Sequence, residues 1–591
     1  MDAGLQGEEA ARPGRARLAV AVLLLLALAA VLLGRTWMTW LDPFVDGSKE
    51  LRIPQRVAHG ERLYADVVCH YGPVPNWAHA AAFRLLGDRL MTPLALLLPL
   101  AGLAFGALFV LARRAAGLAA AAWGTASGLV LALVAPNGGA LVLPYSYAGT
   151  HSLALSALGL VLSLSDRAGP LAAAAGCWAL ALASKQELAV AAMGASLLAH
   201  AVGRPFPRLV PLRAALAVAG GFLGGAALFA YAIRGIPGEL LAPEGPLILF
   251  AIPEEWRRLF RWVSGLDAPG ESLAAVATSA LLVLLSLALV EVAGRQEERL
   301  SPRRRALFRA AFAAALAAGA AVLLRSPFGR EVDRALPPLL AVVPLAALAA
   351  AALSALRGTG GGPAERARVA LLGFAGLGAF RVLLRVAYGW IATPFTAFAA
   401  PALAAAAAAA AFLILPKRRA LLSIAFAALT ALQLGRLWLQ TEPRRFATVE
   451  TAAGALRLPA DRAAVVRATL GFLAREARPG DGLAGFPESG LFNFVLGLPS
   501  PMRLEQLLPG SLDAAGEERF ARTLREAGPR FVLIPNQPTT MFGAVAFGRD
   551  YARPLKAAID DRYRLVASFG APPSEPVGSP RFFVRVLERA P

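Results

Sequence analysis

Long apolar stretches recur through the first 440 residues of the chain, and they restrict its fold more than any other feature. A helix needs about 20 apolar residues to cross the hydrocarbon core of a membrane. About thirteen stretches meet this criterion, namely residues 17–36, 91–112, 115–135, 150–165, 168–184, 188–203, 209–233, 272–293, 306–325, 335–356, 368–388, 395–415 and 419–440. Only 17% of the chain is charged, against about a quarter in a soluble domain. The sequence therefore predicts a polytopic α-helical membrane protein.

The net charge of +20 raises the question of a nucleic-acid partner. The basic residues do not form one patch, however, but fall in alternate loops between the spans. They are Arg113 and Arg114, then Arg204, Arg208 and Arg213, then 303–305, Arg366 and Arg368, and finally 417–419. The intervening short loops, 136–149 and 388–396, contain neither Lys nor Arg. This positive-inside pattern predicts a cytoplasmic N-terminus and argues against a nucleic-acid partner.

An odd number of spans places the first loop and the C-terminal tail on the outer side of the membrane. Ala27-Leu-Ala29 would suit a signal-peptide cleavage site, but Arg35, Trp37 and Trp40 favour an uncleaved anchor with an interfacial belt. Abundant Ala, Arg, Gly and Pro with little Lys are typical of a GC-rich bacterial genome. We therefore expect a multi-pass protein of the bacterial cytoplasmic membrane.

The composition of the chain changes at about residue 440. Residues 1–440 form the predicted membrane domain, whose two long outside loops are 37–90 and 234–271. Within the second loop, apolar and basic residues follow helical spacing over 254–262. This pattern indicates an amphipathic helix that lies on the membrane surface, with a substrate contact as the alternative interpretation.

Residues 441–591 contain no further apolar span. We predict helices at 462–477 and 517–527 and strands at 482–486, 530–535, 563–569 and 581–587. Helices that alternate with short strands indicate an extracytoplasmic α/β domain. This domain has no Walker A sequence, no Gly-x-Gly-x-x-Gly and no nucleophile elbow, so we assign it no catalysis. We expect it to cap the membrane domain or to help select an acceptor.

Three carboxylates with a spacing of four residues follow the first span. They are Asp42, Asp46 and Glu50, and a helix would align them on one face. An ionised carboxylate can act as a general base toward an acceptor hydroxyl or amine that attacks an activated sugar. Each acid also has a structural alternative. Asp42 could form a turn, Asp46 could cap a helix, and Glu50 could pair with Lys49 or with an outside arginine.

Asp66, His70 and Tyr71 are further candidate substrate contacts in the first loop. An isolated aspartate such as Asp66, between glycines, more often forms a turn than binds a ligand. The histidines of this loop do not have the spacing of a zinc site. Two or three convergent carboxylates would suit Mg²⁺ or Mn²⁺, but the sequence assigns no definite metal site and no other cofactor.

Five basic residues are predicted near the outer ends of the spans, namely Lys185, Arg330, Arg334, Arg381 and Arg385. Ionisable groups at this depth are costly and are usually functional. Arginine binds phosphate bidentately, and lysine offers a point charge. Together these residues would hold the phosphate of a lipid carrier whose tail lies in the bilayer. The alternative is that each side chain extends to the interface, where its charge is hydrated.

The loop motifs resemble those of a known class of enzymes. The sequence contains Asp46-x-x-x-Glu50, Gly60-x-x-x-Tyr64-x-Asp66 and Tyr71-Gly-Pro73, followed by Pro144-Tyr-Ser146 and Ser184-Lys-Gln-Glu187. With about thirteen spans and an outside α/β domain, this layout resembles the GT-C class of membrane glycosyltransferases. Within that class it is similar to the protein-mannosyltransferase-like branch, family 39.

This resemblance implies an inverting hexosyl or pentosyl transferase with a polyprenyl-phosphate-linked sugar as donor and a lipid, glycan or protein as acceptor. In the class, an acidic residue of the first outside loop is the catalytic base, and Asp46 is the matching position. The class usually has an adjacent acidic pair, whereas Asp46 is followed by Gly47. Glu50 therefore remains a second candidate for the base.

Two other functions also involve lipid-linked saccharides. A membrane transporter or flippase would have internal repeats and charged residues near the membrane midplane, whereas the charges here lie at the outer rim. An O-antigen ligase or polymerase usually has its long catalytic loop late in the chain. The sequence therefore favours a glycosyltransferase at the outer face of the cytoplasmic membrane.

Overall fold

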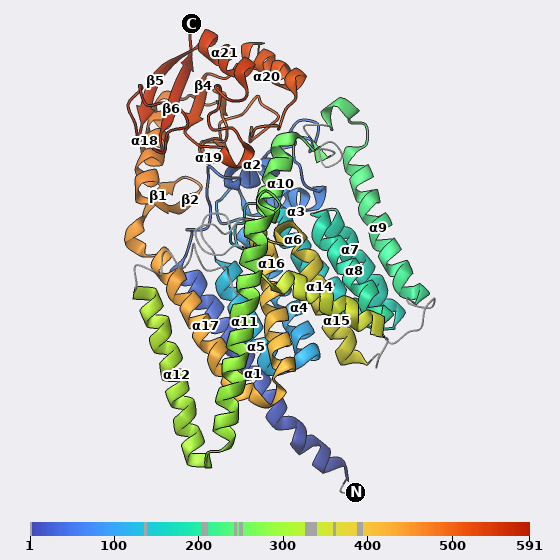
Figure 1. The fold of residues 1–591 in the computed structure, drawn as a ribbon. Coiled ribbons are helices and arrows are strands. Elements are labelled where there is room, and N and C mark those ends of the chain that lie inside the picture. The colour runs from blue at the N-terminus through green and yellow to red at the C-terminus, as the bar shows by residue number, and fades with distance from the viewer. Residues whose placement is uncertain are drawn as a thin grey trace.

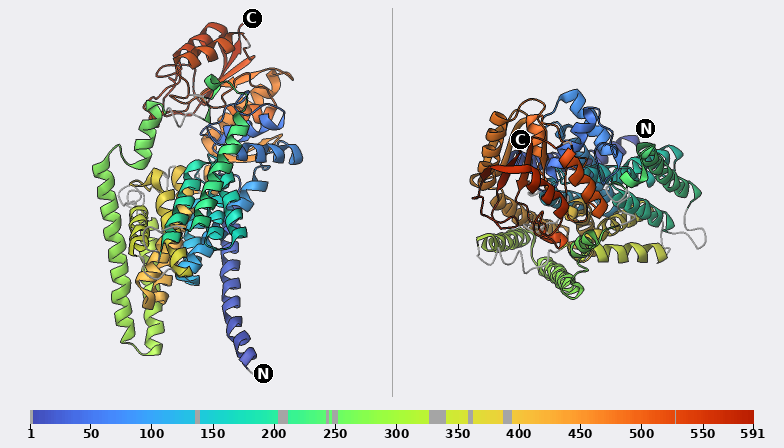
Figure 2. Two further views of the ribbon diagram at one scale, coloured as in Figure 1. Left: turned by 90° about the vertical axis from the view of Figure 1, so that its right-hand side faces the viewer. Right: turned by 90° about the horizontal axis from the view of Figure 1, so that it is seen from above.

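The computed structural model of the protein describes most of the chain. The described residues are 3–134, 139–202, 211–241, 245–246, 252–325, 340–357, 362–386, 394–526 and 528–591. A bundle of helices is covered at one end by a smaller part that contains the strands (Figure 1). The N-terminus lies at the other end of the bundle (Figures 1 and 2). An odd number of membrane crossings predicts that the N-terminus and the strand-containing part lie at opposite ends of the bundle.

Each span predicted from the sequence falls on a helix of the bundle. The helices are α1 (Ala3–Arg35), α4 (Leu94–Ala116), α5 (Leu118–Gly128), α6 (Tyr147–Ser163), α7 (Ala168–Leu182), α8 (Gln186–Ala201), α9 (Leu212–Ile233), α11 (Pro269–Glu298), α12 (Pro302–Arg325), α14 (Val343–Arg357), α15 (Pro363–Gly378), α16 (Pro394–Ile414) and α17 (Arg419–Gln440). Among the described residues, seven helical segments are long and apolar enough to cross a membrane. The predicted polytopic α-helical architecture is confirmed.

Two shorter helices, α2 (Gly47–Ala58) and α3 (Pro73–Leu86), form the segment between α1 and α4, which the sequence predicts to be the first outside loop. They lie between the helix bundle and the strand-containing part (Figure 1). Residues 47–56 of α2 are all buried, although several of them are charged. Burial of charged side chains is costly unless each has a partner. The role of α2 therefore depends on the residues that pair with its buried charged side chains.

The C-terminal domain, residues 441–591, contains two sheets. Its elements are β1 (Phe446–Thr451), β2 (Gly454–Pro459), α18 (Ala460–Glu476), β3 (Leu483–Gly485), α19 (Gly490–Leu496), α20 (Ala514–Glu526), β4 (Phe531–Pro535), α21 (Arg553–Arg562), β5 (Tyr563–Phe569) and β6 (Val584–Arg589). All four predicted strands and both predicted helices are present. The β1–β2 hairpin, α19 and α21 were not predicted.

The larger sheet has the strand order β3-β4-β6-β5, with β3 and β4 parallel and the other neighbours antiparallel. Every residue of β4 is buried, because both faces of the strand are covered. Phe531 and Leu533 share a core cluster with side chains of α18 and α19, whereas Val532 and Ile534 share another with α20 and α21. The wholly apolar run 531–535 is thus the signature of a strand buried on both sides.

The C-terminal domain and the first outside loop share one apolar core. The ring centroids of Phe44 and Phe492 are 6.2 Å apart, and those of Phe83 and Phe494 are 5.7 Å apart. The backbone contributes as well, because the N–H of Val68 donates to the carbonyl oxygen of Arg503 over 2.9 Å. The C-terminal domain is therefore packed onto the first loop as one unit.

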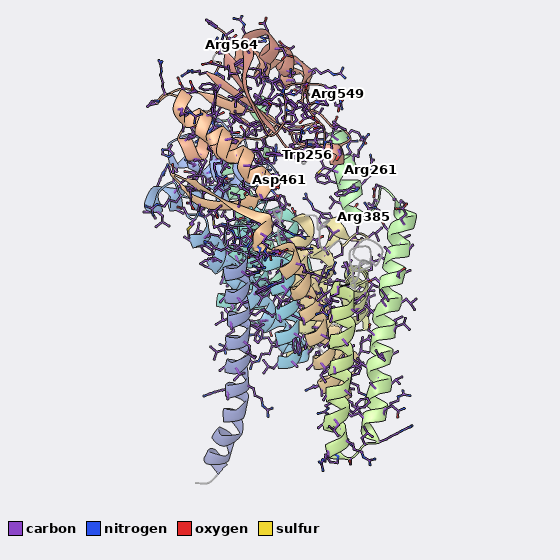
Figure 3. All side chains as sticks on the ribbon, turned by 90° about the vertical axis from the view of Figure 1, so that its left-hand side faces the viewer. Trp256, Arg261, Arg385, Asp461, Arg549 and Arg564 are labelled. Atoms are coloured by element: carbon purple, nitrogen blue, oxygen red, sulfur yellow. The ribbon has the colours of Figure 1, made fainter. Side chains whose placement is uncertain are left out.

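The predicted amphipathic helix is present as α10 (Glu254–Ser264). Its apolar face is covered by protein, which corrects the expectation that this face lies on the membrane. Trp256 donates its ring N–H to the carbonyl oxygen of Pro509 over 3.1 Å, and its ring lies 6.4 Å from that of Phe542. Figure 3 shows Trp256 beside the C-terminal domain, with Arg261 further along α10. The helix connects the C-terminal domain to the bundle.

Candidate functional site

The N-terminus of α2 carries the first candidate base. Asp46 occupies the N-cap position with a left-handed backbone, φ 65°, but its side chain makes no capping hydrogen bond. The side chain of Glu488, from the C-terminal domain, takes that role. It accepts hydrogen bonds from the N–H groups of Asp46 and Ser48 over 2.8 and 3.1 Å. The interpretation of Asp46 as the side-chain cap of this helix is therefore wrong.

The carboxylate of Asp46 is held by two donors. Lys49 Nζ and Gln506 Nε2 both donate to Oδ1, the latter over 2.9 Å. Within the described residues, no hydrogen bond reaches Oδ2. The side chain retains 19% of its exposure, so solvent or a ligand can reach it. One oxygen is thus fixed, and the other is available to accept a proton.

Glu50 lies one turn further along α2 and has a different environment. Its Oε2 accepts a hydrogen bond over 2.6 Å from the backbone N–H of Tyr147, at the start of α6. Burial raises the pKa of Glu50 to about 8. No ion pair joins Glu50 to Lys49 or to an arginine among the described residues, contrary to that alternative. This geometry suits Glu50 to orienting α6 against α2.

Asp42 and Asp66 lie in structural turns. Asp42 accepts a hydrogen bond from the N–H of Phe44 over 3.0 Å, and it forms an ion pair with Arg462 at 3.2 Å. Asp66 accepts a hydrogen bond from the N–H of Arg62 over 2.7 Å. Each of these two acids therefore has partners of its own. The described residues contain no cluster of three or more potential metal ligands.

His70 and Tyr71 border the same region as Asp46. Together with Lys49 and Gln506 they line a small pocket with a volume of about 10 Å³, which is room for about one water molecule. The imidazole of His70 packs edge-on against Trp256, with ring centroids 5.1 Å apart. Burial and the positive charge of Lys49 lower the pKa of His70 to about 4. His70 is therefore neutral at neutral pH.

Tyr71 lies near two lysines. Its ring centroid is 5.9 Å from Lys49 Nζ and 5.0 Å from Lys185 Nζ. An aromatic face within about 6 Å attracts a cation. The ring is therefore a common neighbour of Lys49, which contacts the carboxylate of Asp46, and of a second group of charges around Lys185.

The second group contains the cations that the sequence places at the outer rim. Lys185 is 2% exposed and donates to the hydroxyl oxygen of Tyr145 over 2.6 Å. Both Lys185 and Arg381 form ion pairs with Glu187, at 3.6 and 3.5 Å. Two cations thus lie beside one carboxylate, a grouping of basic side chains that suits an anion.

The other predicted cations are placed differently. Arg385 pairs with Asp267 at 3.0 Å and donates to the carbonyl oxygen of Trp262 over 2.9 Å. It lies below α10 at the outer end of the bundle (Figure 3). Arg330 and Arg334 fall outside the described residues. The structure therefore brings Lys185 and Arg381 together and gives Arg385 its own acidic partner.

Backbone hydrogen bonds join two of the motifs noted in the sequence. The N–H of Gly72 donates to the carbonyl oxygen of Ser184 over 3.0 Å, and that of Val74 donates to Ala183 over 3.2 Å. A Cβ atom on Gly72 would lie 2.0 Å from the carbonyl oxygen of Ala183, so only glycine fits there. This junction fixes Tyr71 relative to Lys185.

Gly72→Ala tests this junction. The clash is with backbone, so we expect a loss of about 1–3 kcal/mol of stability, the usual effect of overpacking, and a lower melting temperature in detergent. Gly102→Ala is the control, because nothing lies within 4 Å of its added Cβ. An unchanged melting temperature for Gly72→Ala would contradict the fixed junction.

The sequence does not indicate Lys49, Glu488 or Gln506 as site residues. It offers Lys49 only as a partner for Glu50. Glu488 and Gln506 belong to a domain to which the sequence assigned no catalysis, and they carry no motif. The one local indication is that Pro487 and Glu488 directly follow a predicted strand, because polar residues in the loops after strands often face a functional site.

Fold and site define a polytopic membrane protein with a partly exposed carboxylate and a group of cations near one tyrosine. No family model and no curated protein sequence matches the chain. Among solved structures it is similar to ArnT from Cupriavidus metallidurans, with 14% identity and a TM-score of 0.41 over 96% of this chain and 97% of that one. It is also similar to the oligosaccharyltransferase AglB from Archaeoglobus fulgidus, with 13% identity and a TM-score of 0.47 over 96% and 74%.

Both of these proteins are GT-C glycosyltransferases, the class that the loop motifs resemble. Their TM-scores are below 0.5, so neither likeness fixes the fold or the activity of this chain by itself. An assignment of function therefore depends on the loop motifs and on the geometry of Asp46, Tyr71 and Lys185.

Proposed function

We propose that the protein transfers a sugar from a polyprenyl-phosphate-linked donor to a lipid, glycan or protein acceptor, with Asp46 as the general base. The observation that supports this most is the grouping around Tyr71. Lys49, which donates to the carboxylate of Asp46, and Lys185, which pairs with Glu187 as Arg381 does, lie 5.9 and 5.0 Å from its ring centroid. A base and a group of cations near one ring suit a displacement at a sugar carbon between them.

The proposed reaction is a single displacement. Oδ2 of Asp46 accepts the proton of the acceptor hydroxyl or amine as its oxygen or nitrogen attacks the anomeric carbon. The bond between that carbon and the phosphate oxygen breaks, and the electron pair leaves with the carrier phosphate. The anomeric configuration is inverted. Lys185 and Arg381 bind the phosphate and stabilise the charge that develops on it.

The orientation in the membrane follows from the loop charges. The N-terminal end of the bundle is on the cytoplasmic side if basic loops stay inside. The site and the C-terminal domain, at the other end, then face outward (Figure 1). A carrier whose tail lies in the bilayer brings its phosphate to this rim. The ArnT and AglB structures include complexes with undecaprenyl phosphate and with dolichol-phosphate, the class of carrier proposed here.

A transfer assay tests this function. Membranes that contain the full-length protein are supplied with a set of radiolabelled polyprenyl-phosphate sugars, and labelled product and released carrier phosphate are measured together. We expect both to rise in equal amounts for at least one donor, in proportion to the protein present. A transporter would move the labelled lipid across the membrane without releasing carrier phosphate, and that result would contradict the proposal.

A further inference from the structure

Two side chains of the C-terminal domain contact Asp46 directly, and the reaction proposed above gives them no role. Glu488 Oε2 accepts the N–H of Asp46 over 2.8 Å, and Gln506 Nε2 donates to Asp46 Oδ1 over 2.9 Å. We infer that Glu488 and Gln506 are positioning residues for Asp46, so that the membrane domain and the C-terminal domain build one active site together. This inference rests on the proposed role of Asp46 as the base.

Glu488 fixes the backbone around Asp46. Its two oxygens accept hydrogen bonds from five donors, which are the N–H groups of Asp46, Ser48 and Lys49, the hydroxyl of Ser48 and the amide of Gln506. The first N–H groups of a helix have no partner within the helix and attract a negative charge. Because Glu488 satisfies them from another domain, the side chain of Asp46 is released from capping and can act on a ligand.

Gln506 fixes the carboxylate itself. Its amide nitrogen donates to Asp46 Oδ1 and to Glu488 Oε2, the latter over 2.7 Å, and its amide oxygen accepts from Lys49 Nζ over 2.9 Å. These three contacts allow only one orientation of the amide. With Oδ1 held in this way, Oδ2 is the oxygen left for the proton of an acceptor.

The two positioning residues are held side by side by their own backbone. Glu488 and Gln506 form an antiparallel bridge, and the N–H of Leu507 donates to the carbonyl oxygen of Pro487 over 2.8 Å. Docking of the domain has separate anchors, such as the ion pair of Arg56 with Glu505 at 2.7 Å. A substitution at Gln506 therefore leaves these docking contacts in place.

The inference predicts an effect on kcat that is separate from donor binding. Without the Gln506 amide, the carboxylate of Asp46 loses one of its two donors and turns more freely, so it is less often in position for the acceptor proton. The donor phosphate is proposed to bind Lys185 and Arg381 instead, so the KM for the donor should not change. A residue that only held the domains together would change the melting temperature rather than kcat.

Gln506→Met tests the inference in the full-length protein, because methionine keeps the length of the side chain and lacks the amide. We expect kcat to fall about 10- to 100-fold and the KM for the lipid-linked donor to stay within about twofold. Glu488→Gln is the second variant, because an amide nitrogen in place of one carboxylate oxygen cannot accept a hydrogen bond. It should show the same signature.

Arg503→Ala is the matched control. Arg503 donates to the carbonyl oxygens of Ala65 and Tyr64 across the same interface, away from Asp46. We expect a lower melting temperature and a kcat within about twofold of the wild type. If Gln506→Met and Glu488→Gln keep the kcat of the wild type while Asp46→Asn is inactive, the inference is wrong and the proposed function stands. A fully active Asp46→Asn would overturn both.

Discussion

Asp46→Asn should lower sugar transfer by at least about 100-fold, the lower range of what a general base contributes. The asparagine oxygen can still accept hydrogen bonds from Lys49 and Gln506, so the local geometry is retained. The amide cannot accept a proton from the acceptor, however, so the nucleophile is not activated. The measurement is labelled product formed per minute in membranes with equal amounts of protein.

Two controls separate this effect from damage to the loop. Asp66→Asn changes an acid of the same loop in an exposed turn, and we expect activity within about twofold of the wild type, as for a surface site away from special contacts. Glu50→Gln tests the second candidate base. If Glu50→Gln abolishes transfer and Asp46→Asn does not, the base is Glu50.

Lys185→Met should raise the KM for the lipid-linked donor about 10- to 100-fold, because a hydrogen bond to a charged group contributes about 1.5–3 kcal/mol. Methionine has a similar length but no charge, so Arg381 alone would face the carrier phosphate. We expect a smaller change in the KM for the acceptor. The measurement is initial rate against donor concentration, together with binding of undecaprenyl phosphate.

Arg385→Gln is the matched control for charge at the outer rim. Arg385 pairs with Asp267 at 3.0 Å, whereas Lys185 and Arg381 both contact Glu187. We expect Arg385→Gln to leave the donor KM within about twofold of the wild type. Equal effects of the two substitutions would mean that the rim charges act as a diffuse field rather than as a phosphate site.

The helices of the bundle could be predicted from the sequence because length and apolar composition are local properties. The run 531–535 likewise marks a strand buried on both faces. The periodicity of 254–262 gave the correct helix, with Trp256 on its apolar face, but it could not show that protein covers that face. A pattern along the chain specifies which face is apolar, and only the packing decides its partner.

Four residues of the candidate site are already candidates in the sequence, namely Asp46, Tyr71, Lys185 and Arg381. In the structure Lys185 lies 5.0 Å from the ring centroid of Tyr71 and contacts Glu187, as Arg381 does. The sequence could not distinguish a catalytic Asp46 from a helix cap, because an aspartate directly before a helix can serve either as a base or as a cap. The deciding residue, Glu488, is 442 positions away in the chain, and no local pattern connects positions so far apart.

The separation of Asp46 and Glu488 along the chain has a consequence for the biosynthesis of the protein. A chain that enters the membrane from its N-terminus exposes the first loop long before the ribosome reaches Glu488, 442 residues later. During that interval the start of α2 has neither its external cap nor the amide of Gln506. On the proposed mechanism, a nascent chain is therefore inactive toward lipid-linked sugars until the last part of the polypeptide has been synthesised, translocated and folded onto the loop.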